Sequence, residues 1–266
     1  MASLSTAERE TYRQEGYLIP EYRLPADRLA GLQRALDEAI AANPGVRPEH
    51  LVSIHVQGKN AEGIVGSNAF LEIAQDPDIL DLVEAAIGPD IILWGCHLFC
   101  KPAGDGLEVP WHQDGHYWPI RPLATCTVWI ALEASDRENG CLRVIPGSHE
   151  PAVLKDHMRE EGGALTQRLG HDDFDEAAAV DIELEPGQMS MHDVYMIHGS
   201  NRNTSERRRA GLAIRYMPAT SLFDRDLFRR SDSSGFTVDC STRPLWLVRG
   251  QDQTGRNDFT VGHAAA

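Results

Sequence analysis

Two histidines and one aspartate have the residue types and spacing of a metal site. His112 and Asp114 are separated by one residue, and His198 lies much further along the chain. Side chains alternate between the faces of a β-strand, so residues i and i+2 project to the same side. A histidine on another strand then completes the set of two imidazoles and one carboxylate that binds non-haem Fe(II) and leaves positions open for a co-substrate and O₂. The alternative is that these are ordinary polar residues at a surface rim.

Composition limits the kinds of partner. The chain has 266 residues and a formal net charge of −15, which argues against a nucleic-acid partner because such partners favour a basic face. The first residues lack the pattern of a signal peptide, and no apolar run approaches the ~20 residues that span a bilayer. The five cysteines lack metal-site spacing and are typical of reduced thiols. We expect a cytoplasmic protein without a membrane partner, either a monomer or a homodimer.

The secondary-structure signals change character at residue 91. In residues 1–90, Ser5 and Glu8 form a capping-box pattern, and apolar residues recur at helical spacing between Leu29 and Ile40. From residue 91, short apolar runs separated by turn signals predict strands. These runs cover residues 91–99, 125–132, 141–145, 180–184, 188–191, 194–198 and 210–217. A helical part followed by many short strands predicts a mainly β sandwich or barrel buttressed by the N-terminal helices.

We expect residues 1–266 to form a single domain with three parts. A helical part, 1–90, precedes a β core, 91–218, and a C-terminal tail, 219–266, in which periodicity is weak. The polar and acidic stretch 149–179 interrupts the core. We interpret it as an excursion over the barrel mouth rather than as a second domain.

Several ordered motifs together resemble one known family. They are Trp111-His112-Gln113-Asp114 with Tyr117-Trp118, the run from Asn139 to His149, and His198-Gly199-Ser200 followed by Arg209 and Arg215-Tyr216. This set resembles the phytanoyl-CoA hydroxylase-like family of Fe(II)- and 2-oxoglutarate-dependent oxygenases, which includes ectoine hydroxylases and bacterial natural-product hydroxylases. The resemblance is strong over roughly residues 91–218. It implies a double-stranded β-helix, the jelly roll also seen in cupins.

The resemblance implies a reaction as well as a fold. The expected activity is hydroxylation of an unactivated C–H bond of a small-molecule metabolite, using Fe(II), 2-oxoglutarate and O₂ and releasing succinate and CO₂. Related halogenases carry a small residue where this chain has Asp114, so we expect oxidation rather than halogenation. Desaturation, ring closure or epimerisation at the same iron centre stays open. A rival of a different class is a non-catalytic barrel that senses a metal or small ligand.

Arg209 is the expected partner of the distal carboxylate of 2-oxoglutarate. The family places this arginine eleven residues after the distal histidine, and a guanidinium suits a carboxylate because it can form two parallel hydrogen bonds. On a strand, Arg209 shares a face with Gly211 and Ala213, whose small side chains leave room for a ligand. Arg207 and Arg208 are the neighbouring alternatives, and we interpret them as a solvated turn.

Three further residues are expected near the co-substrate by resemblance. Thr125 and Ser200 match hydroxyls that approach the co-substrate in similar enzymes, and His97 matches a position that is often polar. The alternatives are strand hydroxyls satisfied by the backbone and a histidine of the core. His192 has the same parity as His198, so it could also face the interior.

The substrate-facing residues are expected to be Tyr117, Trp118, Trp129 and Arg215. The aromatic side chains follow or face the predicted ligand strand, where loops usually frame a binding site. Arg215 shares the face of Arg209 and could reach an anionic group. The alternative is an aromatic cluster of the barrel core with a salt bridge at its rim.

Overall fold

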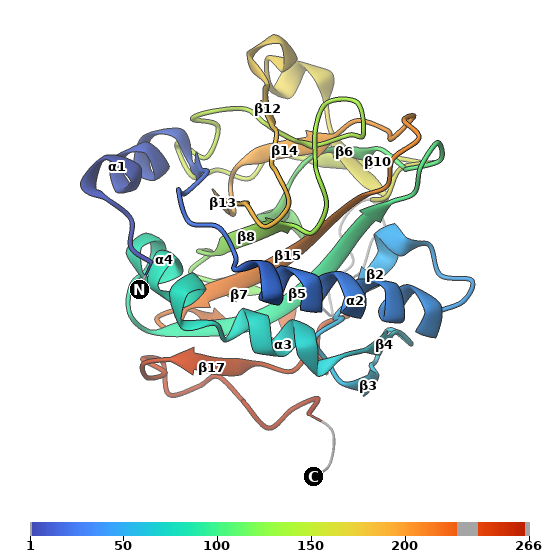
Figure 1. The fold of residues 1–266 in the computed structure, drawn as a ribbon. Helices are drawn as coiled ribbons and strands as arrows, with labels where there is room; N and C mark the ends of the chain where they lie inside the picture. The colour runs from blue at the N-terminus through green and yellow to red at the C-terminus, as the bar shows by residue number, and fades with distance from the viewer. Residues whose placement is uncertain (1, 228–238, 264–266) are drawn as a thin grey trace.

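Two antiparallel β-sheets form the double-stranded β-helix that the resemblance implied (Figure 1). The computed structural model describes residues 2–227 and 239–263. The larger sheet has the order β1 (Tyr17–Leu18), β13 (Met189–Asp193), β8 (Cys126–Ala131), β15 (Arg209–Pro218), β5 (Ile91–Lys101) and β17 (Trp246–Arg249), and β2 (Leu51–Val52) also pairs with β5. The smaller sheet has the order β12 (Val180–Ile182), β9 (Leu142–Val144), β14 (Ile197–Ser200) and β6 (Val109–Gln113).

The N-terminal helices cover the outer face of the larger sheet (Figure 1). They are α1 (Thr6–Glu15), α2 (Ala26–Ala42), α3 (Asn68–Ala74) and α4 (Pro77–Ile87). The predicted capping box of Ser5 and Glu8 begins α1. Leu212, Ile214 and Tyr216 of β15 are fully buried in the same cluster as helix residues such as Leu36. The alternate residues of β15 therefore face the interior of the barrel, as their period-two pattern predicted.

The C-terminal tail contributes more to the sheet than its weak periodicity suggested. β17 extends the larger sheet by pairing with β5, and Leu245 just before it is buried. Earlier in this tail, β16 (Leu222–Phe223) pairs with β7 (Ile120–Arg121). A hairpin of β3 (Gly58–Lys59) and β4 (Val65–Gly66) lies in the N-terminal part. Among the described residues, every helix is too short or too polar to cross a bilayer.

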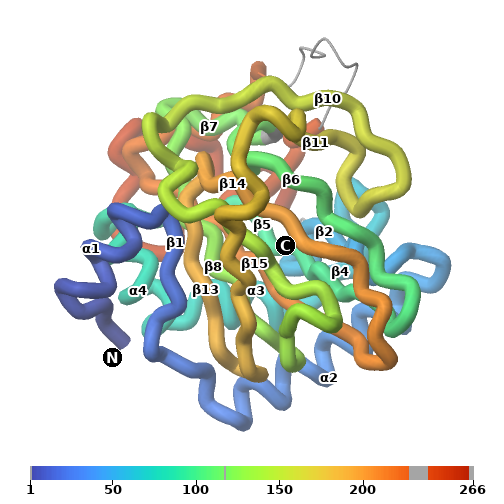
Figure 2. The backbone as a smooth tube through the Cα atoms, turned by 90° about the horizontal axis from the view of Figure 1, so that it is seen from above, coloured from blue at the N-terminus to red at the C-terminus, as the bar shows by residue number. Residues whose placement is uncertain are grey.

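The excursion 149–179 lies against the smaller sheet rather than apart from it. Its hairpin of β10 (His157–Arg159) and β11 (Gln167–Leu169) runs near β6 and β14 in Figure 2. Gln113, at the end of β6, anchors this segment: its side-chain amide donates to the carbonyl oxygen of Val153, and its side-chain oxygen accepts from the backbone N–H of Lys155. The segment between two core strands is thus tied directly to the strand that carries His112.

Candidate metal and co-substrate site

The predicted metal ligands meet where β6 and β14 pair. His112 and His198 are register partners, and their ring centroids are 4.1 Å apart. Asp114 does not lie on the strand as predicted, because β6 ends at Gln113 and Asp114 begins a 3₁₀ turn, η2 (Asp114–Tyr117). Its carboxylate still turns toward both histidines, at 3.5 Å from Nε2 of His112 and 4.0 Å from Nε2 of His198. One ligand atom from each residue lies within 4.8 Å of the others.

Backbone contacts set the tautomer of both histidines. Nδ1 of His112 donates to the carbonyl oxygen of Pro110 at 2.8 Å, and Nδ1 of His198 donates to that of Met196 at 3.0 Å. A carbonyl oxygen can only accept, so each Nδ1 carries a proton and each neutral ring keeps its lone pair on Nε2. These are the outer-shell hydrogen bonds that orient metal-ligating histidines. Both rings are therefore prepared to offer Nε2 to a metal.

The charges of the three groups suit a divalent metal. Burial opposes the charged form of Asp114, but contacts from His112 and His192 and the charge of Arg215 outweigh it and hold the Asp114 pKa well below its usual range. Burial and the neighbouring His112 and His192 hold the pKa of His198 well below its usual value. A carboxylate beside a neutral imidazole is the protonation state that metal binding requires. The donor set therefore fits Fe(II) in a two-histidine, one-carboxylate site.

A cavity between the two sheets connects these ligands to two arginines. It has a volume of about 440 Å³, including the part open to solvent, and its walls include His112, Asp114, His198, Ser200, Arg209 and Arg215. The predicted metal ligands and both arginines therefore line one shared cavity.

Arg209 is buried in this cavity without an acidic partner. Its Nε donates to the carbonyl oxygen of Gly140 at 3.1 Å, and one terminal nitrogen donates to that of Phe99 at 3.3 Å. Its guanidinium lies 5.3 Å from the ring of Trp129. Burial lowers its pKa to about 10, so it stays charged at neutral pH. Among the described residues, no carboxylate lies within ion-pair distance of Arg209, so the cavity offers a charged site for an anion.

The neighbouring arginines are already paired. Arg207 contacts Asp136 at 2.7 Å, and Arg208 contacts Glu133 at 2.5 Å and Asp37 at 2.9 Å. The side chains of Arg207 and Arg208 both retain exposure to solvent, whereas Arg209 is 2% exposed. Of these three arginines, Arg209 is therefore the one that faces the interior, as the sequence predicted.

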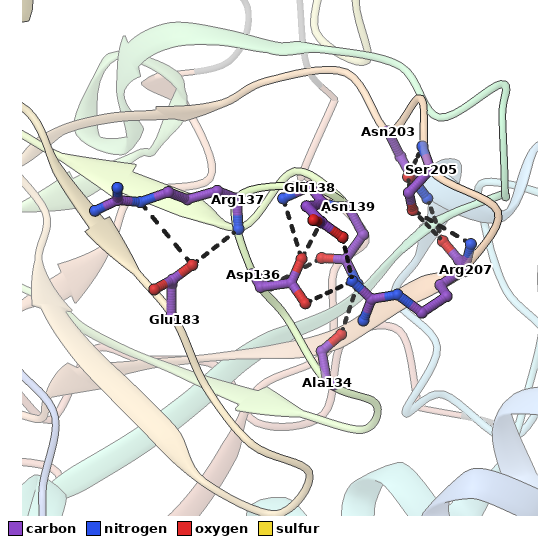
Figure 3. A network of polar contacts seen from close by, with 9 residues as sticks. All are labelled: Ala134, Asp136, Arg137, Glu138, Asn139, Glu183, Asn203, Ser205 and Arg207. Atoms are coloured by element: carbon purple, nitrogen blue, oxygen red, sulfur yellow. Dashed lines mark hydrogen bonds and ion pairs between the residues drawn. The ribbon is translucent and has the colours of Figure 1, made fainter.

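A polar network holds the loop that supplies a partner to Arg209 (Figure 3). Asn139 is fully buried, its amide donating to the carbonyl oxygen of Ala134 and its side-chain oxygen accepting from the backbone N–H of Asp136. The guanidinium of Arg207 donates to the side-chain carboxylate of Asp136. The loop ends at Gly140, where a Cβ would lie 2.4 Å from the carbonyl oxygen of Asn201. Only glycine fits this close approach, which places the Gly140 carbonyl beside Arg209.

The structure brings some of the predicted co-substrate residues to the cavity and not others. Ser200 lines the cavity, and its hydroxyl has no hydrogen-bond partner. Thr125 lies just before β8 and is not part of the wall, where Thr127 stands instead. His97 is also absent from the wall: its Nε2 contacts the carbonyl oxygen of Glu49 at 2.9 Å, and its ring stacks on Phe99. His97 thus has the contacts of a core histidine.

The predicted substrate residues divide into two groups. Trp129 lies in the wall against Arg209, on the side expected for the co-substrate. Trp118 packs edge-on against Trp94, with ring centroids 4.5 Å apart, and lies 5.1 Å from the guanidinium of Arg215. The side chain of Tyr117 lies outside the described part of the chain. Trp118 therefore lies beside Arg215, whereas Trp129 lies beside Arg209.

Three residues near the site gave only weak sequence signals or none. His192 lines the cavity, with Nε2 3.8 Å from Asp114. Lys101 is fully buried opposite Arg209 in the β5–β15 register, and its ammonium donates to the carbonyl oxygens of Ser200 and Asn201. Burial lowers the Lys101 pKa to about 6. Thr127 could have been found by extending the alternation from Trp129 by two residues.

Comparison with known proteins identifies relatives that resemble this chain in sequence or in fold. The sequence model described as phytanoyl-CoA dioxygenase (PhyH) matches residues 12–211. A Bos taurus protein named phytanoyl-CoA dioxygenase, peroxisomal, is 30% identical over 239 residues, covering 81% of this chain and 69% of that protein. A probable alpha-ketoglutarate-dependent hypophosphite dioxygenase of Stutzerimonas stutzeri is 31% identical over 156 residues, covering 57% and 54%. The solved structure of the non-heme monooxygenase ThoJ has a TM-score of 0.70 at 26% identity, covering 96% of this chain and 86% of that one.

Proposed function

The chain belongs to the phytanoyl-CoA dioxygenase family and is an Fe(II)- and 2-oxoglutarate-dependent dioxygenase, and we propose that it hydroxylates a C–H bond of a small molecule. One observation carries the proposal: His112, Asp114 and His198 converge in the same cavity as Arg209, a buried arginine without an acidic partner. A metal set with open positions and a separate anion site are the two requirements for chelating 2-oxoglutarate.

The roles of individual residues follow from their contacts. His112 and His198 would offer Nε2 and Asp114 a carboxylate oxygen to iron, which supplies the oxidative chemistry when bound. Arg209 would hold the distal carboxylate of 2-oxoglutarate, with the free hydroxyl of Ser200 as a further donor. Trp129 would fix the guanidinium from the side. The protein would thereby orient the co-substrate and exclude water from the reacting end.

Two predicted co-substrate contacts and one substrate contact change in this proposal. We assign the role expected of Thr125 to Thr127, which lines the cavity. We assign a structural role to His97, whose Nε2 contacts the carbonyl oxygen of Glu49. We assign Trp129 to the co-substrate site instead of the substrate site, because its ring lies against the guanidinium of Arg209. Trp118 and Arg215 keep their proposed place on the substrate side.

Hydroxylation is favoured over halogenation because Asp114 occupies the carboxylate position of the ligand set. Desaturation, ring closure and epimerisation use the same ligands, so they are alternative outcomes of the same experiment. A purely ligand-sensing barrel has no need for a metal set that leaves coordination positions open beside a separate anion site.

We further propose that residues 1–266 act as one catalytic domain in the cytoplasm, as a monomer or homodimer. All five cysteines are free and buried, which suits a reducing compartment. The net charge of −15 supports a small-molecule substrate rather than a nucleic acid.

The test is a screen for succinate formation from 2-oxoglutarate with Fe(II), O₂ and a broad panel of metabolites. A true substrate should raise succinate formation and yield a product heavier by one oxygen atom. A product lighter by two hydrogens would indicate desaturation or ring closure instead. If iron and 2-oxoglutarate give no succinate above the Asp114→Ala variant with any compound, the proposed function fails.

A further inference from the structure

A second arginine lines the cavity at a distance from the first. Arg209 and Arg215 project from the same face of β15, and the strand's irregularity comes only after Arg215. A strand advances about 3.4 Å per residue, so their Cα atoms are separated by about 20 Å. Burial lowers the pKa of Arg215, while the charge of Asp114 acts in the opposite direction. The cavity therefore has two cationic ends, and Arg215 lies at the end where Asp114 acts on it.

The guanidinium of Arg215 lies close to two tryptophan rings and, among the described residues, forms no ion pair with a carboxylate. Its guanidinium lies 5.7 Å from the ring of Trp94 and 5.1 Å from that of Trp118. Its Nε is shielded from solvent and has no hydrogen-bond partner in residues 2–227 and 239–263. Among the described residues, no carboxylate oxygen lies within ion-pair distance of it, and the oxygens of Asp114 turn toward the three histidines.

Arg243 differs from Arg215 in having a carboxylate partner, although the Nε of each is buried without a hydrogen bond among the described residues. Arg243 also approaches Trp94, with its guanidinium 5.8 Å from the ring. A Cβ at Gly95 would lie 4.0 Å from both Arg215 Cδ and Arg243 Nη1, so the two side chains are neighbours. Arg243 forms an ion pair with Glu62 at 2.7 Å. Two guanidinium groups thus share one aromatic neighbour, and within the described part of the chain the one that faces the cavity has no carboxylate in ion-pair distance.

A hydroxyl beside Arg215 is also unused. Thr127 of β8 is the register partner of Arg215 on one side and of His192 on the other. Its side chain lines the cavity, and its buried Oγ1 has no hydrogen-bond partner among the residues that the structure describes. Side chains directly opposite each other on neighbouring strands lie about 4.5–5.5 Å apart at Cβ. One small oxyanion could therefore accept hydrogen bonds from both Thr127 and Arg215.

We propose that Arg215 and Thr127 form the substrate's anion site, so the substrate is a small organic acid whose carboxylate or phosphonate binds there. The inference rests on the proposed function, because it assigns the distal carboxylate of 2-oxoglutarate to Arg209. Arg215 is partly buried, and a cation held away from water is costly unless it is paired. 2-Oxoglutarate has a single distal carboxylate. The second cationic end is thus matched by a charge that the substrate brings. Trp94 and Trp118 would hold the guanidinium of Arg215 in place for the anion.

The experiment uses the Fe(II)-loaded enzyme saturated with 2-oxoglutarate, without O₂. The probes are propionate, benzoate, 3-phenylpropionate, methylphosphonate and phenylphosphonate, each compared with its neutral amide or dimethyl ester. Binding is followed by the visible absorption of the iron complex and by tryptophan fluorescence, since Trp94 and Trp118 flank Arg215. The carboxylate and phosphonate arms distinguish the two kinds of headgroup.

At least one acid should bind wild type about tenfold or more tightly than its neutral partner, since hydrogen bonds between charged groups have that magnitude. Arg215→Gln should remove the preference, and Arg215→Lys should keep part of it because the charge remains without the bidentate geometry. Arg243→Gln is the matched control and should keep the full preference. If Arg215→Gln does not fold, Thr127→Val and Arg215→Lys should still weaken the acid severalfold without affecting the neutral partner.

The inference is overturned if wild type shows no preference for any acid, or if Arg215→Gln retains the preference. It is also overturned if the acid competes with 2-oxoglutarate, because the acid would then occupy the Arg209 end. Failure of the proposed function looks different: the absorption of the iron complex with 2-oxoglutarate would be missing before any probe is added.

Discussion

His112 and His198 are direct register partners across β6 and β14, although long stretches of chain separate them in sequence. Their ring centroids are 4.1 Å apart, and each Nδ1 is bound to a backbone carbonyl two residues earlier. The strand pairing therefore fixes both the distance between the rings and the nitrogen that each ring presents. A metal bound between them would link the two strands of the smaller sheet.

Replacing His198 should abolish stable iron binding. After anaerobic loading and desalting, wild type should hold one Fe(II) per chain, and His198→Ala should hold nearly none, as measured by metal analysis. His192→Ala is the matched control, because its ring is only 4.7 Å from that of His198 but lies outside the ligand set. Equal iron content in wild type and His198→Ala, or loss of iron in His192→Ala alone, would contradict the assignment.

Replacing Arg209 should weaken 2-oxoglutarate binding without removing iron. Arg209→Gln should cost about 1.5–3 kcal/mol of binding free energy, the range for hydrogen bonds to charged groups. Calorimetric titration of the metal-loaded protein measures it. Arg208→Gln should leave the affinity near wild type, because Arg208 is paired with Glu133 outside the cavity. The reverse order of effects would mean that the wrong arginine was assigned.

Gly211 should be required for the position of Trp129. A Cβ at Gly211 would lie 1.8 Å from the indole ring, so Gly211→Ala must displace Trp129 from its place beside Arg209. Overpacking of this kind costs about 1–3 kcal/mol of unfolding free energy, and 2-oxoglutarate affinity should fall as well. Gly31→Ala in α2 is the control, since a Cβ there would lie 3.9 Å from Nη2 of Arg34, an ordinary contact distance. Gly211→Ala with wild-type stability and affinity would refute this packing role.

His55 should make the protein less stable as pH falls. Burial, with Arg243 and His263 nearby, lowers its pKa to about 3, whereas the unfolded chain takes up the proton near pH ~6.5. Between these values the unfolded state binds one more proton, so the unfolding free energy should fall by about 1.4 kcal/mol per pH unit. His55→Phe should remove this contribution, because neither ring nitrogen has a hydrogen-bond partner. Denaturant titrations at pH 6.5 to 4 measure the slope; an identical slope in the variant would exclude His55.

The sequence predicted most strands of the barrel, and the structure brings the three predicted metal ligands close together. Alternation in β15 placed Arg209 and Arg215 inside and Leu212 outside, because one face of that strand is apolar and the other is not. The metal ligands could be predicted because their types and local spacing are dictated by iron chemistry. Asp114 lies in the turn after β6 instead of on the strand, and its carboxylate still lies close to His112 and His198.

Long-range pairing decided the positions that the sequence did not predict. His192 lines the cavity, as its shared parity with His198 allowed, but β13 and β14 belong to different sheets, so parity alone could not establish this position. Trp129 meets Arg209 only because β8 pairs with β15 in one register. Thr125 and Thr127 share a parity, and the end of β8 determines which of them reaches the cavity. The strand β17 is held in place by its pairing with β5, which its own residues do not reveal.

The central claim is that His112, Asp114, His198 and Arg209 form one site for Fe(II) and 2-oxoglutarate. Its most direct measurement is an anaerobic titration of the apoprotein with Fe(II) and 2-oxoglutarate, followed by the visible absorption of the iron chelate. The account predicts a band that saturates at one 2-oxoglutarate per chain, needs Fe(II), and is absent in His198→Ala. A wild-type protein without the band, or a His198→Ala variant that retains it at full strength, would contradict the account.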